Sequence, residues 1–358
     1  MRVCILGNSL SSLTLAKALV NQKIYVDLIN SKNFRKSNQT RTIGISKSNI
    51  EFFNKSIIDI NKIIWKLKKI QIYSDNLKSE QILNFENNND QLFSIVKNHE
   101  LYDLLKKRLK NNKFFKKVIF KNNSKFFEKY NIVFNTDPFN SINKKYFNKK
   151  ILKIYNSLSY TTVIDHKKIL NDTAVQIFTK KGPLAFLPIS NQKTSVVFSI
   201  NSLKKEKDEN IKKLIRSYSL KYKINKFSKI DSFELKSLNL RSYYFKKFLA
   251  FGDLLHRIHP LAGQGFNMTI RDIKIILEII KNKQNLGLPL DYFINKEFEY
   301  KIRHKNFIFA NGIDLIHEFF NLERKIKSNI LSKSLKLLGN NTRVNKIFTN
   351  VADRGFLL

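Results

Sequence analysis

The N-terminal part of the chain alternates apolar runs with an amphipathic stretch. Residues 2–6 form a short, largely apolar run before Gly7, residues 13–19 repeat apolar side chains at helical spacing, and residues 24–29 form a second apolar run that ends at Asn30. A strand, a glycine turn, a helix and a second strand within about 30 residues are the context of a dinucleotide-binding unit. We therefore expect a parallel βαβ unit at this end of the chain.

The middle of the chain is dominated by strand-like patterns. Alternating apolar positions predict strands over 70–73 and 81–85, and leucines on one face predict a helix over 96–109. Further strands are expected over 118–120, 131–134, 151–155, 174–178, 184–188, 195–200 and 233–240, with a charged helix over 204–222. Strands that follow one another closely favour an antiparallel sheet. We expect an α+β lobe inserted into the parallel unit.

A second Gly-rich turn follows the last predicted strand. Residues 248–251 end in Gly252-Asp253, and a loop with Gly263 and Gly265 leads into a helix that we expect to run from about 265 to 280. An acidic residue at the carboxyl end of a strand, glycines that let the backbone approach a ligand and a helix N-terminus favour a polar, partly anionic cofactor. A helix entered through a Gly-rich loop, with Asp253 as a turn former, explains the pattern equally well.

The C-terminal part, residues 291–338, predicts helices. Their apolar faces are formed by Ile308, Leu315, Ile316, Phe319 and Phe320, and by Ile330, Leu331, Leu335 and Leu338. Packing against the protein core is the default expectation for such faces, and a surface that meets a membrane or a partner is the alternative.

The N-terminal turn departs from the dinucleotide fingerprint G-x-G-x-x-G. Only Gly7 remains, Ser9 and Ser12 stand at the other two glycine positions, and Asn30 stands where an acidic residue is expected. A serine hydroxyl can donate to phosphate and an asparagine can bond ribose hydroxyls, so the unit is compatible with a dinucleotide. A βαβ unit without a ligand is equally consistent. Arg41 is either a solvated charge or a contact to a phosphate or flavin edge.

Composition describes an ordinary globular chain. The 358 residues are 42% hydrophobic and 26% charged, and the single cysteine, Cys4, excludes an internal disulfide and fits a reducing compartment. We expect no membrane span, because the chain has no run of about 18 apolar residues. We also expect no targeting peptide, because the first predicted strand starts at the second residue of the sequence.

The net charge of +38 is the most unusual property of the composition. Lysines are spread along the whole chain among Asn, Ile and Phe residues, as A/T-rich codons would produce without any functional cause. The chain has no aromatic RNA-binding pattern, zinc-ligand spacing or confined basic stripe, so we expect neither nucleic-acid binding nor a metal site. Attraction to an anionic membrane surface needs only a diffuse positive field and remains compatible.

Residues 252–272, GDLLHRIHPLAGQGFNMTIRD, closely resemble the second FAD motif of the class A flavoprotein aromatic hydroxylases. The variant is similar to that of the ubiquinone-biosynthesis hydroxylases, which act on polyprenylated phenols. Four other places agree in the same order: the N-terminal βαβ unit, RTIGIS at 41–46, TKKGPLAFLPIS at 179–190 and DRGF at 353–356.

The resemblance implies an α/β fold like that of p-hydroxybenzoate hydroxylase. A Rossmann-like FAD-binding domain would comprise 1–65, 96–150 and 242–285. An inserted antiparallel substrate-binding sheet would comprise 66–95 and 151–241, and 286–358 would form a C-terminal helical region.

The resemblance also implies roles for individual residues. Asp253 would bond the ribityl chain of FAD, Pro260 would lie beside the isoalloxazine ring, and Asn267 would hold the loop. The remaining cofactor residues would be Gly263, Gln264 and Gly265 at the pyrimidine edge, Arg41 near the flavin, Gly7, Ser9 and Ser12 at the pyrophosphate, and Asn30 at the adenosine ribose. His259, Pro260 and Gln264 are candidates for catalysis, although a structural role is favoured for His256 and His259.

The family's chemistry implies the partners. NAD(P)H or another reductant would reduce the flavin, and O₂ would then form a flavin hydroperoxide that transfers oxygen to a polyprenylated phenol on the route to ubiquinone. The protein would lie on the cytoplasmic side of the inner membrane, in contact with anionic lipid or a quinone-biosynthesis complex.

Departures from the family pattern keep two alternatives open. Glu100 replaces an expected arginine, and the middle motif is Asp137-Pro138 with Ser141 and no arginine. The first alternative, which these departures favour, is a hydroxylase-like scaffold subunit without catalysis. The second is hydroxylation of another apolar aromatic compound, because fold alone does not fix the substrate.

Overall fold

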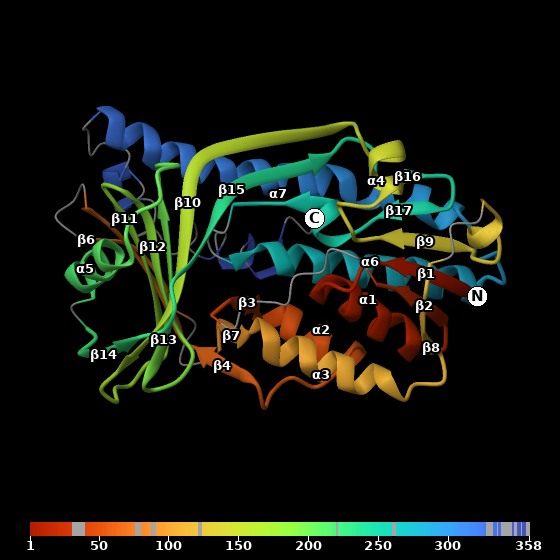
Figure 1. Ribbon diagram of the computed structural model, residues 1–358, viewed down its shortest axis with the longest axis horizontal. Helices are drawn as coiled ribbons and strands as arrows, with labels where there is room; N and C mark the ends of the chain where they lie inside the picture. Colours follow the sequence, from red (N-terminus) through yellow and green to blue (C-terminus); the bar gives the residue numbers. More distant parts are fainter. Residues whose placement is uncertain are drawn as a thin grey trace.

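The protein is described by a computed structural model of the chain (Figure 1). The described residues are 1–30, 40–75, 80–86, 91–120, 124–219, 221–259, 263–326, 332–334, 336–337, 346, 349–351 and 353–355. They form an α/β lobe with a parallel sheet at one end and a lobe with a larger, mostly antiparallel sheet at the other.

The first sheet has six strands in the order β16-β17-β9-β1-β2-β8. The strands are β1 (Arg2–Leu6), β2 (Tyr25–Ile29), β8 (Phe115–Val118), β9 (Ile132–Asn135), β16 (Tyr244–Phe245) and β17 (Phe248–Ala250). All pairs are parallel except the hairpin between β16 and β17. The carboxyl ends of β1, β2, β9 and β17 therefore meet at one edge, where open α/β sheets place ligands.

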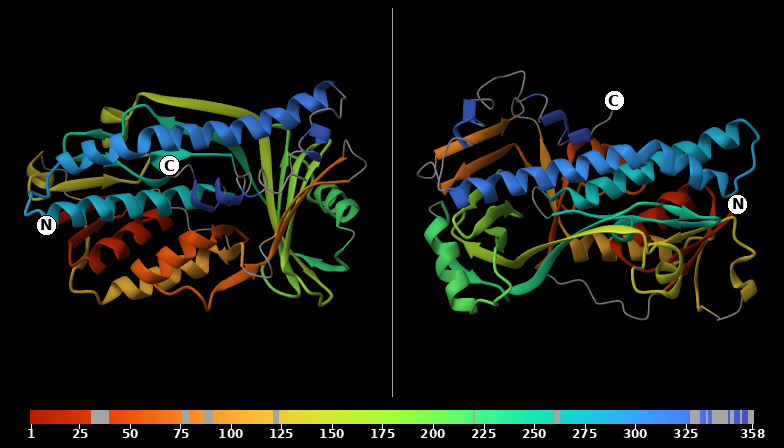
Figure 2. Two further views of the ribbon diagram at one scale, coloured as in Figure 1. Left: turned by 180° about the vertical axis from the view of Figure 1, so that it is seen from behind. Right: turned by 90° about the horizontal axis from the view of Figure 1, so that it is seen from above.

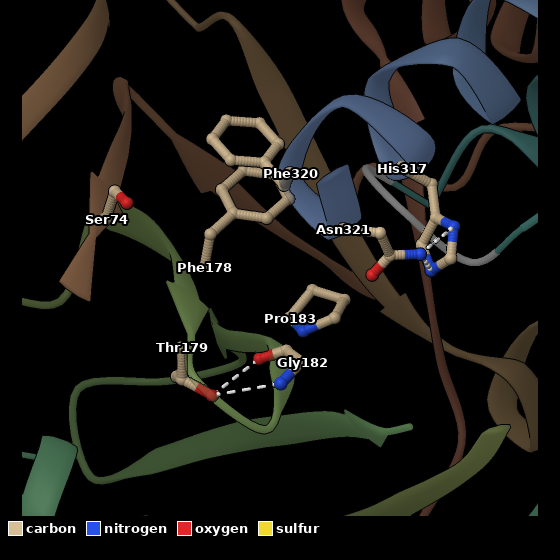
Figure 3. Close-up of a pocket in the computed structure, with 8 residues that line it drawn as sticks. All are labelled: Ser74, Phe178, Thr179, Gly182, Pro183, His317, Phe320 and Asn321. Carbon is tan, nitrogen blue, oxygen red and sulfur yellow. Dashed lines mark hydrogen bonds between the residues drawn. The ribbon is translucent and has the colours of Figure 1, made fainter. Parts of the chain in front are cut away.

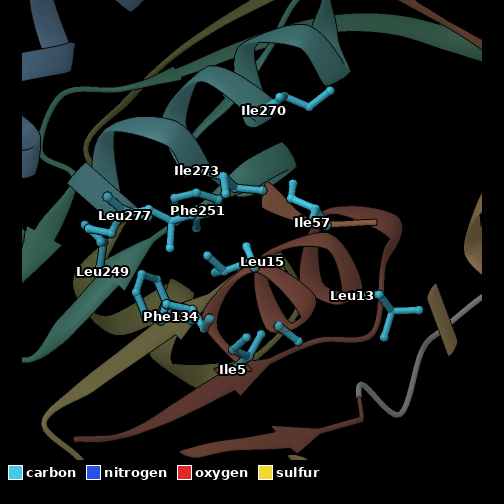
Figure 4. Packing of buried hydrophobic residues seen from close by; sticks show 14 of the residues in the cluster. Ile5, Leu13, Leu15, Ile57, Phe134, Leu249, Phe251, Ile270, Ile273 and Leu277 are labelled. Atoms are coloured by element: carbon cyan, nitrogen blue, oxygen red, sulfur yellow. The ribbon is translucent and has the colours of Figure 1, made fainter. Parts of the chain in front are cut away.

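Helices cover this sheet and close the main core. They are α1 (Leu10–Asn21), α2 (Lys47–Ser56), α3 (Asn98–Lys110), α6 (Gly265–Asn285) and α7 (Phe293–Ile326). Figure 4 shows Ile5, Leu15, Phe134 and Ile273 converging on the space between the sheet and helices α1 and α6, and all four are fully buried. Burying side chains of this size stabilises the fold by about 1.5–3 kcal/mol each.

A small antiparallel sheet connects the two lobes. It has the order β3-β7-β4 and consists of β3 (Thr42–Ser46), β4 (Ile64–Leu67) and β7 (Phe93–Lys97). The Thr42 hydroxyl donates to the Ser195 hydroxyl in the large sheet (2.9 Å), so β3 lies against that sheet.

The large sheet has nine strands. It contains β5 (Lys69–Ser74), β6 (Glu80–Glu86), β10 (Lys150–His166), β11 (Thr173–Thr179), β12 (Gly182–Pro188), β13 (Lys193–Ile200), β14 (Ile224–Phe227), β15 (Asp231–Leu240) and β18 (His256–Arg257). Helix α5 (Asp208–Tyr218) covers one face, where its Ile211 and Ile215 join the cluster that holds Phe186 and Phe198. The remaining helical elements are α4 (Ser141–Tyr146), η2 (Ser124–Phe127) and η3 (Gly252–Leu254).

The opposite face of the large sheet carries smaller side chains, and we call it the small-residue face. Since strand residues alternate between faces, it includes Ser159, Thr161 and Val163 on β10, Ala185 on β12, and Ser195, Val197 and Ser199 on β13, with Leu187 of β12 and Phe233 of β15 as larger members. The bond between Thr42 and Ser195 shows that this face points toward β3 and the first lobe.

The expected α/β fold with an inserted sheet is confirmed, and several local predictions need correction. Strand β10 is much longer than the predicted 151–155, and β5 pairs with β11 in parallel within a sheet expected to be antiparallel. The helix predicted from residue 96 begins at Asn98, because residues 96–97 belong to β7. The strand predicted over 118–120 lies at Phe115–Val118, and the helix predicted over 204–222 is shortened to α5.

The proposed domain boundaries stay a prediction. Three residues expected in a buried helix face, Ile308, Leu315 and Ile316, are exposed on α7. That helix runs along the outside of the molecule from one lobe to the other (Figure 2).

Candidate cofactor and active site

Four polar or turn positions follow the carboxyl ends of parallel strands. Gly7 follows β1, Asn30 follows β2, Asp137 follows β9 by two residues, and Asp253 follows β17 within η3. Asn30 and Asp253 are exposed, so both side chains are accessible to a ligand at this edge. Asp137 is buried, and its carboxylate accepts from the Phe139 amide (2.9 Å). Asp137 is therefore a turn former, which is the commonplace role for Asp-Pro.

The conformation of Gly7 requires glycine. Its φ is +110°, and a Cβ added there would lie 2.4 Å from the hydroxyl oxygen of Thr136. Its amide donates to the carbonyl of Ile29 (2.9 Å), which fixes the turn between β1 and α1 against the end of β2. Gly7, the one glycine of the fingerprint that remains, is therefore at a position where any side chain would be strained.

The two serines of the fingerprint close the N-terminus of α1. The Ser12 amide donates to the Ser9 hydroxyl (3.3 Å) and the Ser9 amide to the Ser12 hydroxyl (3.0 Å), which forms a reciprocal capping box. The Ser12 hydroxyl also bonds that of Thr136 (2.7 Å), which donates to the Leu6 carbonyl. These amides are engaged within the protein, so this helix end offers a phosphate fewer donors than an uncapped end.

The second Gly-rich loop is held by Asn267 in the first turn of α6. Its side chain is fully buried, and its oxygen accepts from the Ser46 amide (3.0 Å) and from the Asn49 side chain (2.9 Å). Its amide group donates to the carbonyls of Gly44 (3.0 Å) and Gly263 (3.4 Å). The role expected for Asn267, holding the loop, has a geometric basis: it joins the start of α6 to β3 and α2.

Gly263 and Gln264 lie at the start of α6. Gly263 has a φ of +62°, a left-handed conformation that favours glycine, and Gln264 is the buried N-cap residue. Gly265 is the first residue of the helix. Pro260 lies outside the described residues, so its expected place beside a flavin ring stays a prediction.

The C-terminal segment is fastened to the same region. The Asp353 carboxylate accepts from the Ser48 amide (2.9 Å) at the N-terminus of α2, and the Asp353 carbonyl accepts from the Ser46 hydroxyl (2.8 Å). Ser46 is also the residue whose amide bonds Asn267. The DRGF motif was noted only as a family feature, and sequence reasoning missed that its aspartate caps α2.

Arg41 is exposed at the edge of the small sheet. Its guanidinium lies over the ring of Phe233, 5.6 Å from the centroid, and its carbonyl accepts from the Asn98 amide (3.0 Å). Glu100, which replaces an expected arginine, is paired with Lys97 (2.7 Å).

His256 has a structural environment. Its Nε2 lies 2.6 Å from a carboxylate oxygen of Asp272, both side chains are buried, and the other oxygen of Asp272 accepts from Asn306 (3.1 Å). This network joins β18 to helices α6 and α7, which supports the structural role favoured for His256.

His259 lies in a buried cluster between the lobes. Its ring is 4.9 Å from that of Tyr155 on β10 and 4.3 Å from that of His317 on α7. Burial, and then the nearby His317 and Lys153, lower the pKa of His259 to about 2. The imidazole is therefore neutral at physiological pH. Tyr155 bonds the Asp314 carboxylate, and burial raises the pKa of that phenol.

A narrow pocket lies beside this cluster (Figure 3). Its walls are Ser74, Phe178, Thr179, Gly182, Pro183, His317, Phe320 and Asn321. The rings of Phe178 and Phe320 are stacked with centroids 3.4 Å apart, and the free volume is about 10 Å³, close to the minimum for one water. A larger, polar cleft of about 260 Å³ lies where Asp353 meets α2.

Metal binding and membrane crossing can be assessed for the described residues. Among them, no group of three or more His, Cys, Asp or Glu side chains is placed to hold a metal ion. None of the helices within the described ranges is long and apolar enough to cross a bilayer.

Comparison with solved structures identifies the fold. The p-nitrophenol 4-monooxygenase PnpA of Pseudomonas putida superposes with a TM-score of 0.77 at 10% identity, over 97% of this chain and 96% of that one. HpxO of Klebsiella pneumoniae, solved with FAD and uric acid, gives 0.75 at 10% identity over 99% and 97%. The chain has the fold of the FAD-dependent monooxygenases.

Sequence comparison supports the narrower resemblance. The chain is 27% identical over 156 residues to the 3-demethoxyubiquinol 3-hydroxylase of Escherichia coli, covering 42% of this chain and 40% of that protein. It is 24% identical over 218 residues to the ubiquinone biosynthesis monooxygenase COQ6 of Dictyostelium discoideum, covering 50% and 44%. The matches thus span less than half the length of these relatives. No protein-family model matches the chain.

Proposed function

We propose that the protein is an FAD-dependent monooxygenase that hydroxylates the ring of a polyprenylated phenol in ubiquinone biosynthesis. The observation that carries this proposal is the loop at residues 263–267, held by Asn267 beside β3 within an FAD-monooxygenase fold. The similarity to ubiquinone-biosynthesis hydroxylases supports the substrate class. NAD(P)H or another reductant and O₂ would be the co-substrates.

The residues at the sheet edge and the loop fit FAD. The exposed carboxylate of Asp253 is available to the ribityl hydroxyls, and the exposed Asn30 side chain to the adenosine ribose. Gly7 keeps the turn that a dinucleotide requires, while Ser9 and Ser12 have their amides in the capping box. We assign the main cofactor contacts to Asp253 and to Gly263, Gln264 and Gly265, with Gly7, Ser9, Ser12, Asn30 and Arg41 contributing less and Pro260 completing the loop.

When bound, the flavin supplies the redox chemistry with O₂, and the protein orients the reactants. The N-terminus of α6 places a positive helix dipole at the loop, which stabilises negative charge on a ligand there. The neutral His259 imidazole can exchange hydrogen bonds without adding a charge. The small-residue face lies opposite the first lobe, and its short side chains make it the candidate wall for the aromatic ring of the substrate.

The substrate class suggests where the protein works. A polyprenylated phenol is stored in a bilayer, and a protein with a net charge of +38 is attracted to anionic lipid. We propose a peripheral position on the cytoplasmic side of the inner membrane, in contact with other quinone-biosynthesis proteins.

A hydroxylase-deficient strain tests the activity. Expression of this chain should restore ring hydroxylation, Asp253→Ala should abolish it, and Asp103→Ala, at an exposed aspartate on α3, should leave it intact. Accumulation of the unhydroxylated intermediate despite expression of a folded wild-type chain would refute the proposal.

One observation favours a second function, that of a non-catalytic scaffold in the quinone-biosynthesis assembly. The capping box of Ser9 and Ser12 uses amides that a pyrophosphate would otherwise engage. A scaffold predicts that Asp253→Ala supports ubiquinone synthesis as well as the wild-type chain does, provided that the strain retains another hydroxylase.

A further inference from the structure

Helix α7 exposes a line of large apolar side chains along its whole length. We call this line the outer stripe, and it consists of Phe293, Tyr300, Phe307, Ile308, Leu315, Leu322 and Ile326. Successive members are mostly seven residues apart, which is close to two helical turns, so they share one face of the helix. Tyr300 is 83% exposed, Leu315 70% and Ile326 62%.

The inner side of the same helix is already packed. Ile302, Phe309, Ile313 and Phe320 are buried on that side. Within the described residues, the outer stripe is therefore a second apolar face that the fold leaves exposed. Large apolar side chains scattered singly over a surface need no explanation, but seven of them on one helix face, with polar residues among them, favour an interaction site.

Charges beside the outer stripe limit what can cover it. Lys296, Arg303 and Lys325 are exposed along the stripe, and the exposed polar residues His304 and Asn311 lie within it. Arg303 is partly neutralised by Glu299 (3.4 Å), and Glu318, an acidic residue on this face, is paired with Lys153 of β10 (3.0 Å). Of the exposed charged residues that the structure describes on α7, three are thus basic and one, Glu318, is acidic, and the chain as a whole is positive.

The exposed basic residues disfavour a second copy of the chain as the occupant of the stripe, because pairing two outer stripes would bring like charges together. An apolar stripe with basic residues beside it matches an anionic bilayer, where lysines contact head groups and apolar side chains enter the boundary with the acyl chains. The stripe spans 33 residue steps, or about 50 Å, so the helix would lie flat in the interface. Tyr300 has the apolar ring and polar tip that favour this depth.

We infer that the outer stripe of α7 docks the protein on an anionic membrane. This inference deepens the proposed function, on which it rests for the location of the substrate. On the inner side of α7, His317 lies 4.3 Å from His259, so the candidate active site would be separated from the lipid by about the thickness of one helix. A substrate whose prenyl chain stays in the bilayer could then present its ring to the loop that precedes α6.

Flotation with lipid vesicles tests this surface on the purified full chain. The probes are vesicles of phosphatidylethanolamine with phosphatidylglycerol, and neutral vesicles of phosphatidylcholine. Tyr300→Ser combined with Leu315→Ser removes two of the most exposed members of the stripe. The matched control is Ile119→Ser combined with Leu170→Ser, at apolar positions that are 86% and 78% exposed outside α7.

We expect the wild type and the matched control to bind anionic vesicles equally and the α7 variant to bind roughly tenfold or more weakly. Neutral vesicles should bind the wild type poorly. Equal binding by the two double variants, or equal binding to both vesicle types, would overturn the inference. A dimer of the wild type that the α7 variant loses, seen in sedimentation without lipid, would assign the stripe to self-association instead.

FAD affinity measured on the same samples separates this inference from the proposed function. A chain that binds vesicles through α7 and no FAD would refute the monooxygenase and retain the docking surface. A chain that binds FAD but not anionic vesicles would refute the docking surface and leave the proposed monooxygenase function intact. Unchanged thermal unfolding of both double variants would show that the exposed substitutions leave the fold intact.

Discussion

Asn267→Ala should damage both the stability of the protein and its affinity for FAD. The side chain is fully buried and bonds four partners, the Ser46 amide, the Asn49 side chain and the carbonyls of Gly44 and Gly263. A buried polar group that loses its partner costs about 1–3 kcal/mol. With the Ser46 amide and one carbonyl affected, we expect the free energy of unfolding to fall by about 2–4 kcal/mol.

The effect on FAD follows from the position of the bonds. Without them the loop at residues 263–267 is no longer held against β3, and FAD affinity should fall tenfold or more. A loss of tenfold in affinity corresponds to about 1.4 kcal/mol. Urea unfolding measures the stability, and quenching of flavin fluorescence on titration measures the affinity.

Asn295→Ala is the matched control for this experiment. Asn295 is an equally buried asparagine in α7, and its amide group donates to the Lys246 carbonyl (3.0 Å), away from the loop. It should lose stability with FAD affinity unchanged. If Asn267→Ala costs less than about 1 kcal/mol and binds FAD as the wild type does, the role given to Asn267 is wrong.

Three further predictions follow from the same structure. Gly7→Ala places a Cβ 2.4 Å from the Thr136 hydroxyl oxygen at a φ of +110°. The free energy of unfolding, measured with urea, should fall by about 1–3 kcal/mol or more. An unchanged free energy of unfolding would contradict the described turn. The pKa of His259 is about 2 in the folded protein and 6.5 in the unfolded chain. As the pH falls below 6.5, the unfolded chain therefore binds a proton at this residue that the folded protein does not. Stability should then decline by up to about 1.4 kcal/mol per pH unit, and His259→Phe should flatten that slope between pH 6.5 and 4.5; an unchanged slope would refute the assignment. Ala185→Phe fills space on the small-residue face, so it should raise KM for the aromatic substrate at least tenfold with FAD affinity unchanged, whereas an unaltered KM would place the substrate elsewhere.

The sequence predicted the carboxyl edge of the parallel sheet better than the packing around it. Strand ends, Gly7 and the loop at residues 263–267 are local features, because glycine conformations and helix entries depend on near neighbours. The tie between Asp353 and α2 joins residues 305 positions apart, and no local pattern marks it. The length of β10 was missed because the strand is irregular after residue 155: Asn156 has a φ of 51°, and the register shifts between Ile154 and Leu158.

Helix α7 shows a different limit. It is apolar on both sides, so periodicity alone could not tell which face was the core, and Ile308, Leu315 and Ile316 were expected inside. Only the arrangement of the lobes decides that Phe309 and Phe320 are buried and that the outer stripe faces solvent.

Titration of the purified chain with FAD tests the central claim most directly. We expect one FAD to bind per chain, with the binding strongly weakened by Asp253→Ala and retained by Asp103→Ala. A folded wild-type protein that contains no flavin and takes up none from excess FAD would contradict a flavin-dependent function for this fold.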